Sequence, residues 1–153
     1  LQLEELKENI KKLNVSNNVF LVGKINGNLK QKFLESSDVF VMPSYKVNNS
    51  IEGFGISYVE AAAYKIPSIA GLDGGVTDAV IDSKTGWCVD PLNKENLANV
   101  LKEAINHRNL REKYGFKAPL VDAPESLDLK LYLRLCGALS ISPITIAVIS
   151  DIL

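Results

Sequence analysis

The run of residues from Ile51 to Glu60 carries the chemistry that the sequence shows most clearly. It places two carboxylates, Glu52 and Glu60, eight positions apart around the glycine turn Gly53-Phe54-Gly55. Glycines at a loop-to-helix junction let the backbone turn tightly and approach a ligand without a Cβ in the way. The free N–H groups and the dipole of the following helix then attract an anion, and a diphosphate fits such a place.

The two carboxylates suit hydroxyl groups rather than the phosphate. Glu52 precedes the helix and can accept hydrogen bonds from hydroxyls in the same cleft, whereas Glu60 lies two turns further on, in line with Ile56. A carboxylate at that place can bind a diol such as a ribose, each hydroxyl donating one bond. Two glutamates eight apart are common by chance. The glycine turn and the small residues Ala61 to Ala63 make the combination specific.

Composition bounds the class of protein. The chain has 153 residues, 46% hydrophobic and 23% charged, which is typical of one soluble globular domain. The net charge is −1 and the basic residues are scattered, which argues against a nucleic-acid partner. The single histidine, His107, excludes a site built on two imidazoles. Cys88 and Cys136 have neither metal-ligand nor disulfide-framework spacing, so reduced thiols and a cytoplasmic location are expected.

The hydrophobic pattern predicts an α/β fold. Helices are expected at 2–13, 28–36, 54–64, 75–81 and 93–106, and strands at 18–22, 38–42, 67–71 and 86–89. Because these strands are apolar on both faces, they predict a Rossmann-like parallel sheet with helices on both faces. Ligands in such sheets bind at the carboxyl ends of the strands, where three loops fall: Gly23-Lys24, Ser44 to Gly55, and Gly71 to Gly75.

An ordered series of motifs resembles the C-terminal, donor-binding half of the family 4 glycosyltransferases. The motifs are Phe20 with Gly23-Lys24, Ser37 to Ser44, Glu52 to Ala61, Ile66-Pro67, Gly74 to Val76, Thr85-Gly86 and Val89 to Pro91. Members of this family are retaining enzymes with two Rossmann-like domains, the GT-B architecture. The resemblance covers residues 1–117, which we expect to form an N-terminally truncated nucleotide-sugar-binding domain.

The resemblance implies roles for the matched positions. Glu52 would be catalytic, bonding to the transferred sugar and stabilising charge during transfer, and Glu60 would bind the ribose. The backbone around Gly53, Phe54, Gly55 and Ile56 would hold the distal phosphate. Gly23, Lys24 and Ile25 would lie beside the base, and Ser44 and Tyr45 would line the cleft. Family members need no divalent metal, so no cofactor is expected and the nucleotide sugar is the donor substrate.

The resemblance also implies a function for the parent protein. It would transfer a sugar from a nucleoside diphosphate sugar to a hydroxyl acceptor with retention, as a hexosyl- or glycosyltransferase. Its partners would be the donor and an N-terminal acceptor domain, at a cytoplasmic location that leaves contact with the inner face of a membrane open. The alternative is a non-catalytic nucleotide-sugar-binding or interaction module. The isolated chain is expected to be inactive, because the acceptor domain and a diphosphate-clamping Arg and Lys would lie before Leu1.

Two departures from the family pattern stand out. Lys65 replaces a common glycine after the motif helix, and a left-handed conformation there would cost on the order of 1 kcal/mol. Lys24 and Lys65 are candidate substitutes for the clamp cations. From residue 118 the strand-helix rhythm ends, and residues 118–153 form an apolar tail of uncertain origin. A helix docking on a missing domain, a foreign sequence and a membrane segment all stay open for this tail.

Overall fold

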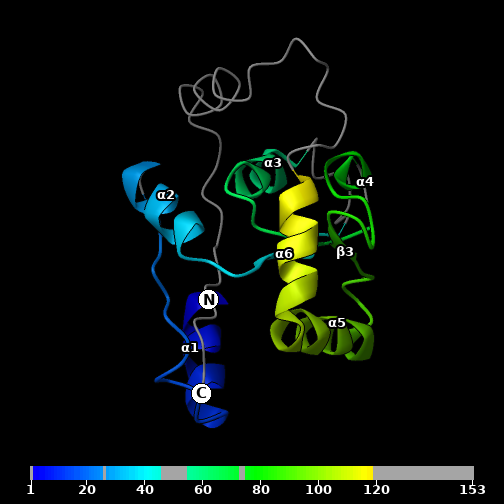
Figure 1. Cartoon of the computed structure of the whole chain (residues 1–153). Helices are drawn as coiled ribbons and strands as arrows, with labels where there is room; N and C mark the ends of the chain where they lie inside the picture. Colours follow the sequence, from blue (N-terminus) through cyan, green and yellow to red (C-terminus); the bar gives the residue numbers. More distant parts are fainter. Residues whose placement is uncertain (1, 26, 46–54, 73–74, 119–153) are drawn as a thin grey trace.

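A computed structural model of the chain describes residues 2–25, 27–45, 55–72 and 75–118 (Figure 1). In chain order the described elements are α1 (Gln2–Lys12), α2 (Gly27–Glu35), β1 (Phe40–Met42), α3 (Ile56–Ala63), β2 (Ser68–Ala70), α4 (Val76–Ala79), β3 (Gly86–Cys88), α5 (Lys94–Asn106) and α6 (Arg108–Lys117). Eight of these nine elements match a predicted one within a few residues at each end.

The strands form a parallel sheet in the order β1-β2-β3. Val41 lies opposite Ile69, and Ile69 lies opposite Trp87. Parallel neighbours need a crossover connection, and here α3 lies in the crossover from β1 to β2 and α4 in that from β2 to β3. The sheet therefore confirms the α/β, Rossmann-like class that the alternation of apolar strands and helices predicted.

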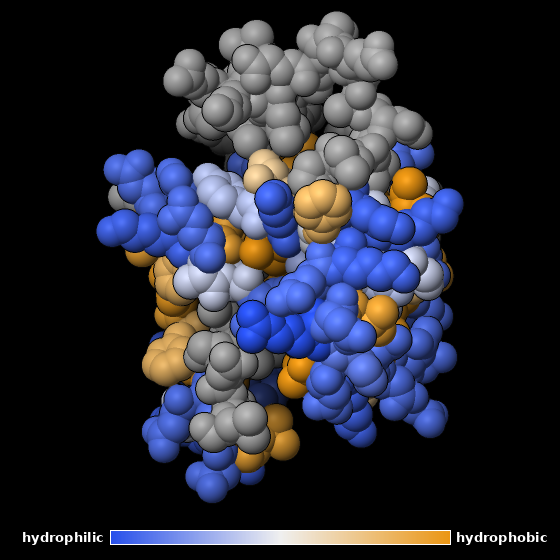
Figure 2. Space-filling view, in the orientation of Figure 1, coloured by the Kyte–Doolittle hydropathy of each residue, from blue (hydrophilic) through white to orange (hydrophobic). Residues whose placement is uncertain are grey.

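Two hydrophobic clusters lie on opposite faces of the sheet, because successive side chains of a strand point to opposite sides. Phe40 and Ala70 face the first cluster, with Leu34 of α2, Tyr58 of α3 and Val76 of α4. The second cluster joins Ile69 and Trp87 to residues of α5 and α6, including Ala104 and Tyr114. Helices thus cover both faces, and hydrophilic residues dominate the outer surface over α5 and α6 (Figure 2).

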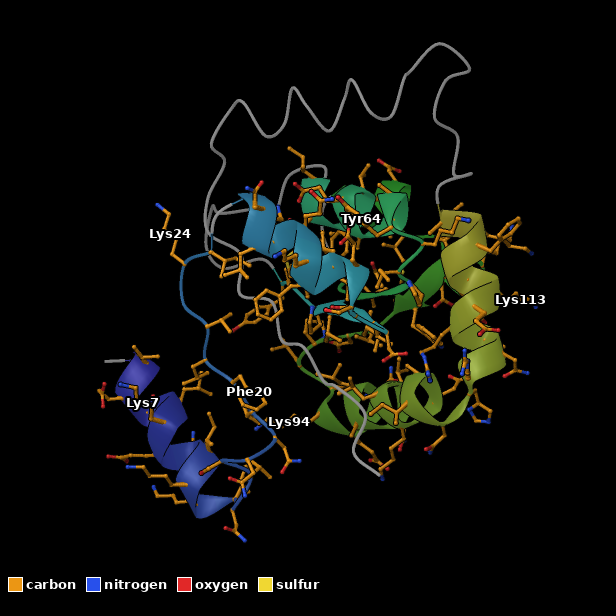
Figure 3. The ribbon with its side chains drawn as sticks, turned by 60° about the vertical axis from the view of Figure 1, so that its left-hand side comes forward. Lys7, Phe20, Lys24, Tyr64, Lys94 and Lys113 are labelled. Atoms are coloured by element: carbon orange, nitrogen blue, oxygen red, sulfur yellow. The ribbon has the colours of Figure 1, made fainter. Side chains whose placement is uncertain are left out.

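The strand predicted at residues 18–22 is wrong. No strand or helix forms there, and the side chains stay accessible, with Phe20 65% and Val19 40% exposed. Figure 3 shows Phe20 on the segment between α1 and α2, apart from the sheet. A strand requires a hydrogen-bonded neighbouring strand, and within the described ranges no strand pairs with these residues; Asn18 and Val19 instead donate to the backbone oxygen of Val15. An apolar run indicates a tendency to be buried, but it does not by itself provide the neighbouring strand that pairing requires.

Helix α1 has the predicted amphipathic pattern but lies apart from the sheet (Figures 1 and 3). Its leucines remain accessible, with Leu3 54% and Leu6 43% exposed. In the part of the chain that the structure describes, no helix combines the length and apolar character that crossing a bilayer requires.

Helix α6 was not predicted from the sequence. It follows α5 after His107, and its Arg111 joins three parts of the fold. The guanidinium donates to the backbone oxygens of Ala104 and Ile105, at 2.8 Å and 2.6 Å, near the end of α5. It also donates to Oδ1 of Asp38, 3.2 Å away, just before β1. Arg111 therefore satisfies carbonyls at a helix end and links them to the start of the sheet.

Lys65 adopts the left-handed conformation for which we expected an energetic cost from the sequence, with φ 61°. The turn is a Schellman motif, in which the Lys65 N–H donates to Ala62 at 2.8 Å and the Ile66 N–H donates to Ala61 at 3.0 Å. The Lys65 ammonium also lies 5.7 Å from the centre of the Phe116 ring. The turn thus contains a lysine where glycine would be free of strain.

Replacing Lys65 by glycine should give a more stable protein than replacing it by alanine. Both changes remove the contact with Phe116, so their difference reports the left-handed strain, and we expect about 1 kcal/mol in favour of glycine. Chemical denaturation measures the free energy of unfolding. The same pair at Lys102, exposed inside α5, should show the opposite sign, with alanine favoured by about 1 kcal/mol. Equal signs at both positions would contradict the strain.

Candidate functional site

The predicted site residues fall into two groups. Glu52, Gly53 and Phe54 lie outside the described residues, so their predicted roles stay predictions. The described positions are distributed over three places: Gly55, Ile56 and Glu60 at or on α3, Ser44 and Tyr45 after β1, and Gly23, Lys24 and Ile25 between α1 and α2.

Gly55 begins the motif helix in a conformation that favours glycine. It is the N-cap of α3, with φ 71° and ψ 46°, and no side chain caps the helix there. A Cβ on Gly55 would lie 2.5 Å from Cδ2 of Tyr58, which is closer than any ordinary contact. The first N–H groups of a helix have no partner within it, so this end of α3 presents donors and a positive dipole end.

Tyr58, to which no sequence motif assigned a role, positions this turn against the sheet. Its side chain is 1% exposed, and its hydroxyl donates to the backbone oxygen of Met42 at the end of β1. The same hydroxyl lies 3.5 Å from Oγ of Ser44. Its ring meets Phe40 edge to face, with centroids 5.8 Å apart. The start of α3 is therefore held at the carboxyl end of β1, where ligands of parallel sheets bind.

The loops that follow β1 and β2 also meet. A Cβ on Gly71 would lie 1.9 Å from the backbone oxygen of Ser44, so only a glycine allows the two backbones to approach so closely. Two of the three predicted loops therefore come together at one edge of the sheet. Tyr45 follows Ser44 with half of its surface exposed, at 50%.

The third predicted loop lies at a different kind of place. Gly23 and Lys24 are exposed, and Figure 3 shows Lys24 pointing outward from the segment between α1 and α2. Ile25 is partly buried and packs against the cluster that contains Leu34 and Tyr58. Because the strand expected before Gly23 is absent, this loop does not follow a strand end.

Glu60 is paired with a lysine that the sequence did not suggest. The carboxylate accepts a hydrogen bond through Oε2 from the ammonium of Lys30 on α2. The Lys30 side chain is 27% exposed and the Glu60 side chain 17%, so the ion pair is largely shielded from water. Neither Lys24 nor Lys65, the two candidate cations, makes this contact. The positions are thirty residues apart, which is why spacing alone could not pair them.

Two further titratable groups near the sheet are held neutral. Burial raises the pKa of Tyr64, the C-cap residue of α3, and the charges of Glu35 and Glu60 raise it further. Burial, with a smaller effect of Asp82, raises the pKa of Cys88 to about 11. The Cys88 thiol also donates to the backbone oxygen of Val80. Cys88 is therefore not an activated nucleophile. Among the described residues no group of acidic, histidine and cysteine side chains could hold a metal ion.

Known glycosyltransferases are similar to this chain in sequence. Over 66% of its length the chain is 33% identical to a GDP-mannose-dependent monoacylated alpha-(1-6)-phosphatidylinositol monomannoside mannosyltransferase of Corynebacterium glutamicum, of which it covers 27%. It is 45% identical over 56 residues, 35% of the chain, to a GDP-mannose-dependent alpha-(1-6)-phosphatidylinositol monomannoside mannosyltransferase of Mycolicibacterium smegmatis, of which it covers 15%. The matched part of the chain thus spans 27% and 15% of the lengths of these two relatives.

Solved structures show the same fold. The C-terminal domain of a glycosyl transferase group 1 family protein from Francisella tularensis superposes with a TM-score of 0.69 at 25% identity, covering 80% of this chain and 60% of that one. Anabaena HepE in complex with UDP gives 0.70 at 22% identity, covering 90% of this chain and 36% of that one. The family model of glycosyl transferases group 1 matches residues 2–120. The chain therefore belongs to the glycosyl transferases group 1 family.

Proposed function

We propose that this chain binds the nucleotide-sugar donor of a glycosyltransferase, at the carboxyl end of β1 where α3 begins. The observation that carries the proposal is Gly55, which starts α3 in the left-handed region with no capping side chain. Such a helix start offers backbone N–H groups and a positive dipole end to a diphosphate. Gly71 and Ser44 bring the loop after β2 to the same place.

Glu60 supports the same assignment. It lies one helical turn after Ile56 on α3, and positions four apart share a face of a helix. Its carboxylate keeps acceptor sites beyond the single bond that it accepts from Lys30, so it can take hydrogen bonds from a diol. A phosphate at the start of α3 and a ribose at Glu60 would lie along one helix, in the order that a nucleoside diphosphate requires.

The parent protein, in this proposal, transfers the sugar to a hydroxyl acceptor with retention of configuration. Glu52 would stabilise the positive charge that develops at the anomeric carbon as the nucleotide leaves, through positioning and electrostatics rather than a covalent bond. The acceptor would be held by a second domain, and no metal would be required. The sequence relatives named above are GDP-mannose-dependent and the Anabaena structure holds UDP, so GDP and UDP sugars are the donors to compare first.

Titration of the isolated chain tests donor binding directly. Protein-observed NMR detects millimolar affinity, and we expect GDP or UDP and their sugars to shift amide signals of Gly55 and Ile56 at the start of α3. The amides of α1, which lies apart from the sheet, should not move (Figure 1). If neither nucleotide shifts these signals, even at tens of millimolar, donor binding by this chain is refuted. Binding without turnover by the parent protein would favour the non-catalytic module instead.

Removing each carboxylate should separate the two roles in the full-length enzyme. Glu52→Ala should lower kcat by at least about a hundredfold and change nucleotide affinity little, because it removes stabilisation of the transition state. Glu60→Ala should mainly weaken nucleotide binding, by about tenfold. Steady-state kinetics and nucleotide titration measure the two effects, and the anomeric configuration of the product checks retention. Glu5→Ala, on the exposed side of α1, is the control. Equal loss of binding in both site variants would contradict the assigned roles.

Gly55→Ala should destabilise the domain and abolish nucleotide binding. The added Cβ would meet the buried Tyr58 ring and would also require a positive φ, so we expect a loss of more than about 2 kcal/mol in the free energy of unfolding. Gly27→Ala at the start of α2 is the control, since nothing lies within 4 Å of its Cβ position. It should change stability by less than about 0.5 kcal/mol. If Gly55→Ala lowered the free energy of unfolding no more than Gly27→Ala, the Gly55 turn would not be constrained in this way.

A further inference from the structure

Lys30 lies on the side of α2 that faces the rest of the fold. It is one helical turn before Leu34, which is 3% exposed in the cluster that contains Tyr58. The next lysine of the same helix, Lys32, is exposed. The Lys30 ammonium reaches across to α3 and donates to Oε2 of Glu60. The fold thus places one partly buried lysine of α2 against the carboxylate assigned to the ribose.

The surroundings of Glu60 explain why a cation is needed there. The Glu60 carboxylate is 17% exposed. Burial raises the pKa of Tyr64, and the charges of Glu35 and Glu60 raise it further. Without Lys30, the Glu60 carboxylate would lose its ion pair while it stays largely shielded from water. A partly buried carboxylate that loses its ion-pair partner turns toward solvent. It would then be a poorer acceptor for two hydroxyl groups.

We propose that Lys30 is a positioning residue for the nucleotide ribose, acting through Glu60. Its ammonium fixes the orientation of the carboxylate through the hydrogen bond to Oε2. The bond occupies one oxygen in one direction and leaves acceptor sites for a pair of hydroxyls. The ribose then binds a carboxylate that is already oriented, so less ordering entropy is lost on binding. This inference rests on the proposed binding of a nucleotide along α3.

A comparison of two nucleotides tests the inference in the full 153-residue chain. The probe is UDP or GDP, whichever the wild type binds more tightly, set against its 2′,3′-dideoxy counterpart in protein-observed NMR titrations. Lys30→Met should weaken binding of the ribonucleotide by about tenfold and leave the dideoxynucleotide unchanged, because the latter offers no diol to Glu60. Lys30→Arg should restore most of the difference. Lys32→Met, on the exposed side of α2, should behave as the wild type.

Combining Lys30→Met with Glu60→Gln tests whether Lys30 acts on ribose binding through Glu60. In that background Lys30→Met should have no further effect on the ratio of the two affinities, since the charge that Lys30 orients is gone. Thermal unfolding of each variant separates binding from stability. An equal loss for both nucleotides, an undiminished effect in the Glu60→Gln background, or no rescue by Lys30→Arg would overturn the inference. Failure of the wild type to bind either ribonucleotide would instead refute the proposed function.

Discussion

The burial of one aromatic ring, that of Tyr58, sets the position of everything else at the candidate site. Its hydroxyl is fixed to the backbone of Met42 and its ring is packed on Phe40, so α3 can start at only one place relative to β1. That ring leaves no room for a side chain on Gly55. Both the left-handed backbone and the buried tyrosine therefore call for glycine at this turn. The free N–H groups of the helix then lie at the sheet edge as a consequence of packing.

The two hydrophobic clusters have different roles on the two faces of the sheet. The cluster that contains Tyr58 lies under α2, α3 and α4, and it supports the residues assigned to the donor. The cluster that contains Trp87 and Tyr114 lies under α5 and α6, with the two rings 4.9 Å apart, and its role is structural. The small residues Ala61 and Ala62 let α3 lie close to the sheet. A site built on a helix start needs this rigid support, because backbone N–H groups cannot be repositioned by side-chain rotation.

The sequence predicts those features that depend on local pattern. Helices α1 to α5, the parallel sheet and the strain at Lys65 all follow from residue type and spacing. Features that depend on distant partners do not. Residues 18–22 are apolar enough for a strand, but pairing decides whether one forms. The ion pair of Lys30 with Glu60 joins two helices whose relative position no periodicity records. Tyr58 was overlooked because an aromatic residue in a helix gives no sign of what its hydroxyl reaches.

The guanidinium of Arg111 has a consequence for how the chain acquires its structure. It joins residues 73 positions apart, and each strand pairing of the parallel sheet likewise spans a whole crossover. Folds dominated by such distant contacts close large loops before those contacts contribute, which makes folding slow. During synthesis the segment that begins β1 leaves the ribosome long before its final partner does. The nascent domain therefore exposes the apolar face of the sheet around Ile69 and Trp87 until α5 and α6 emerge.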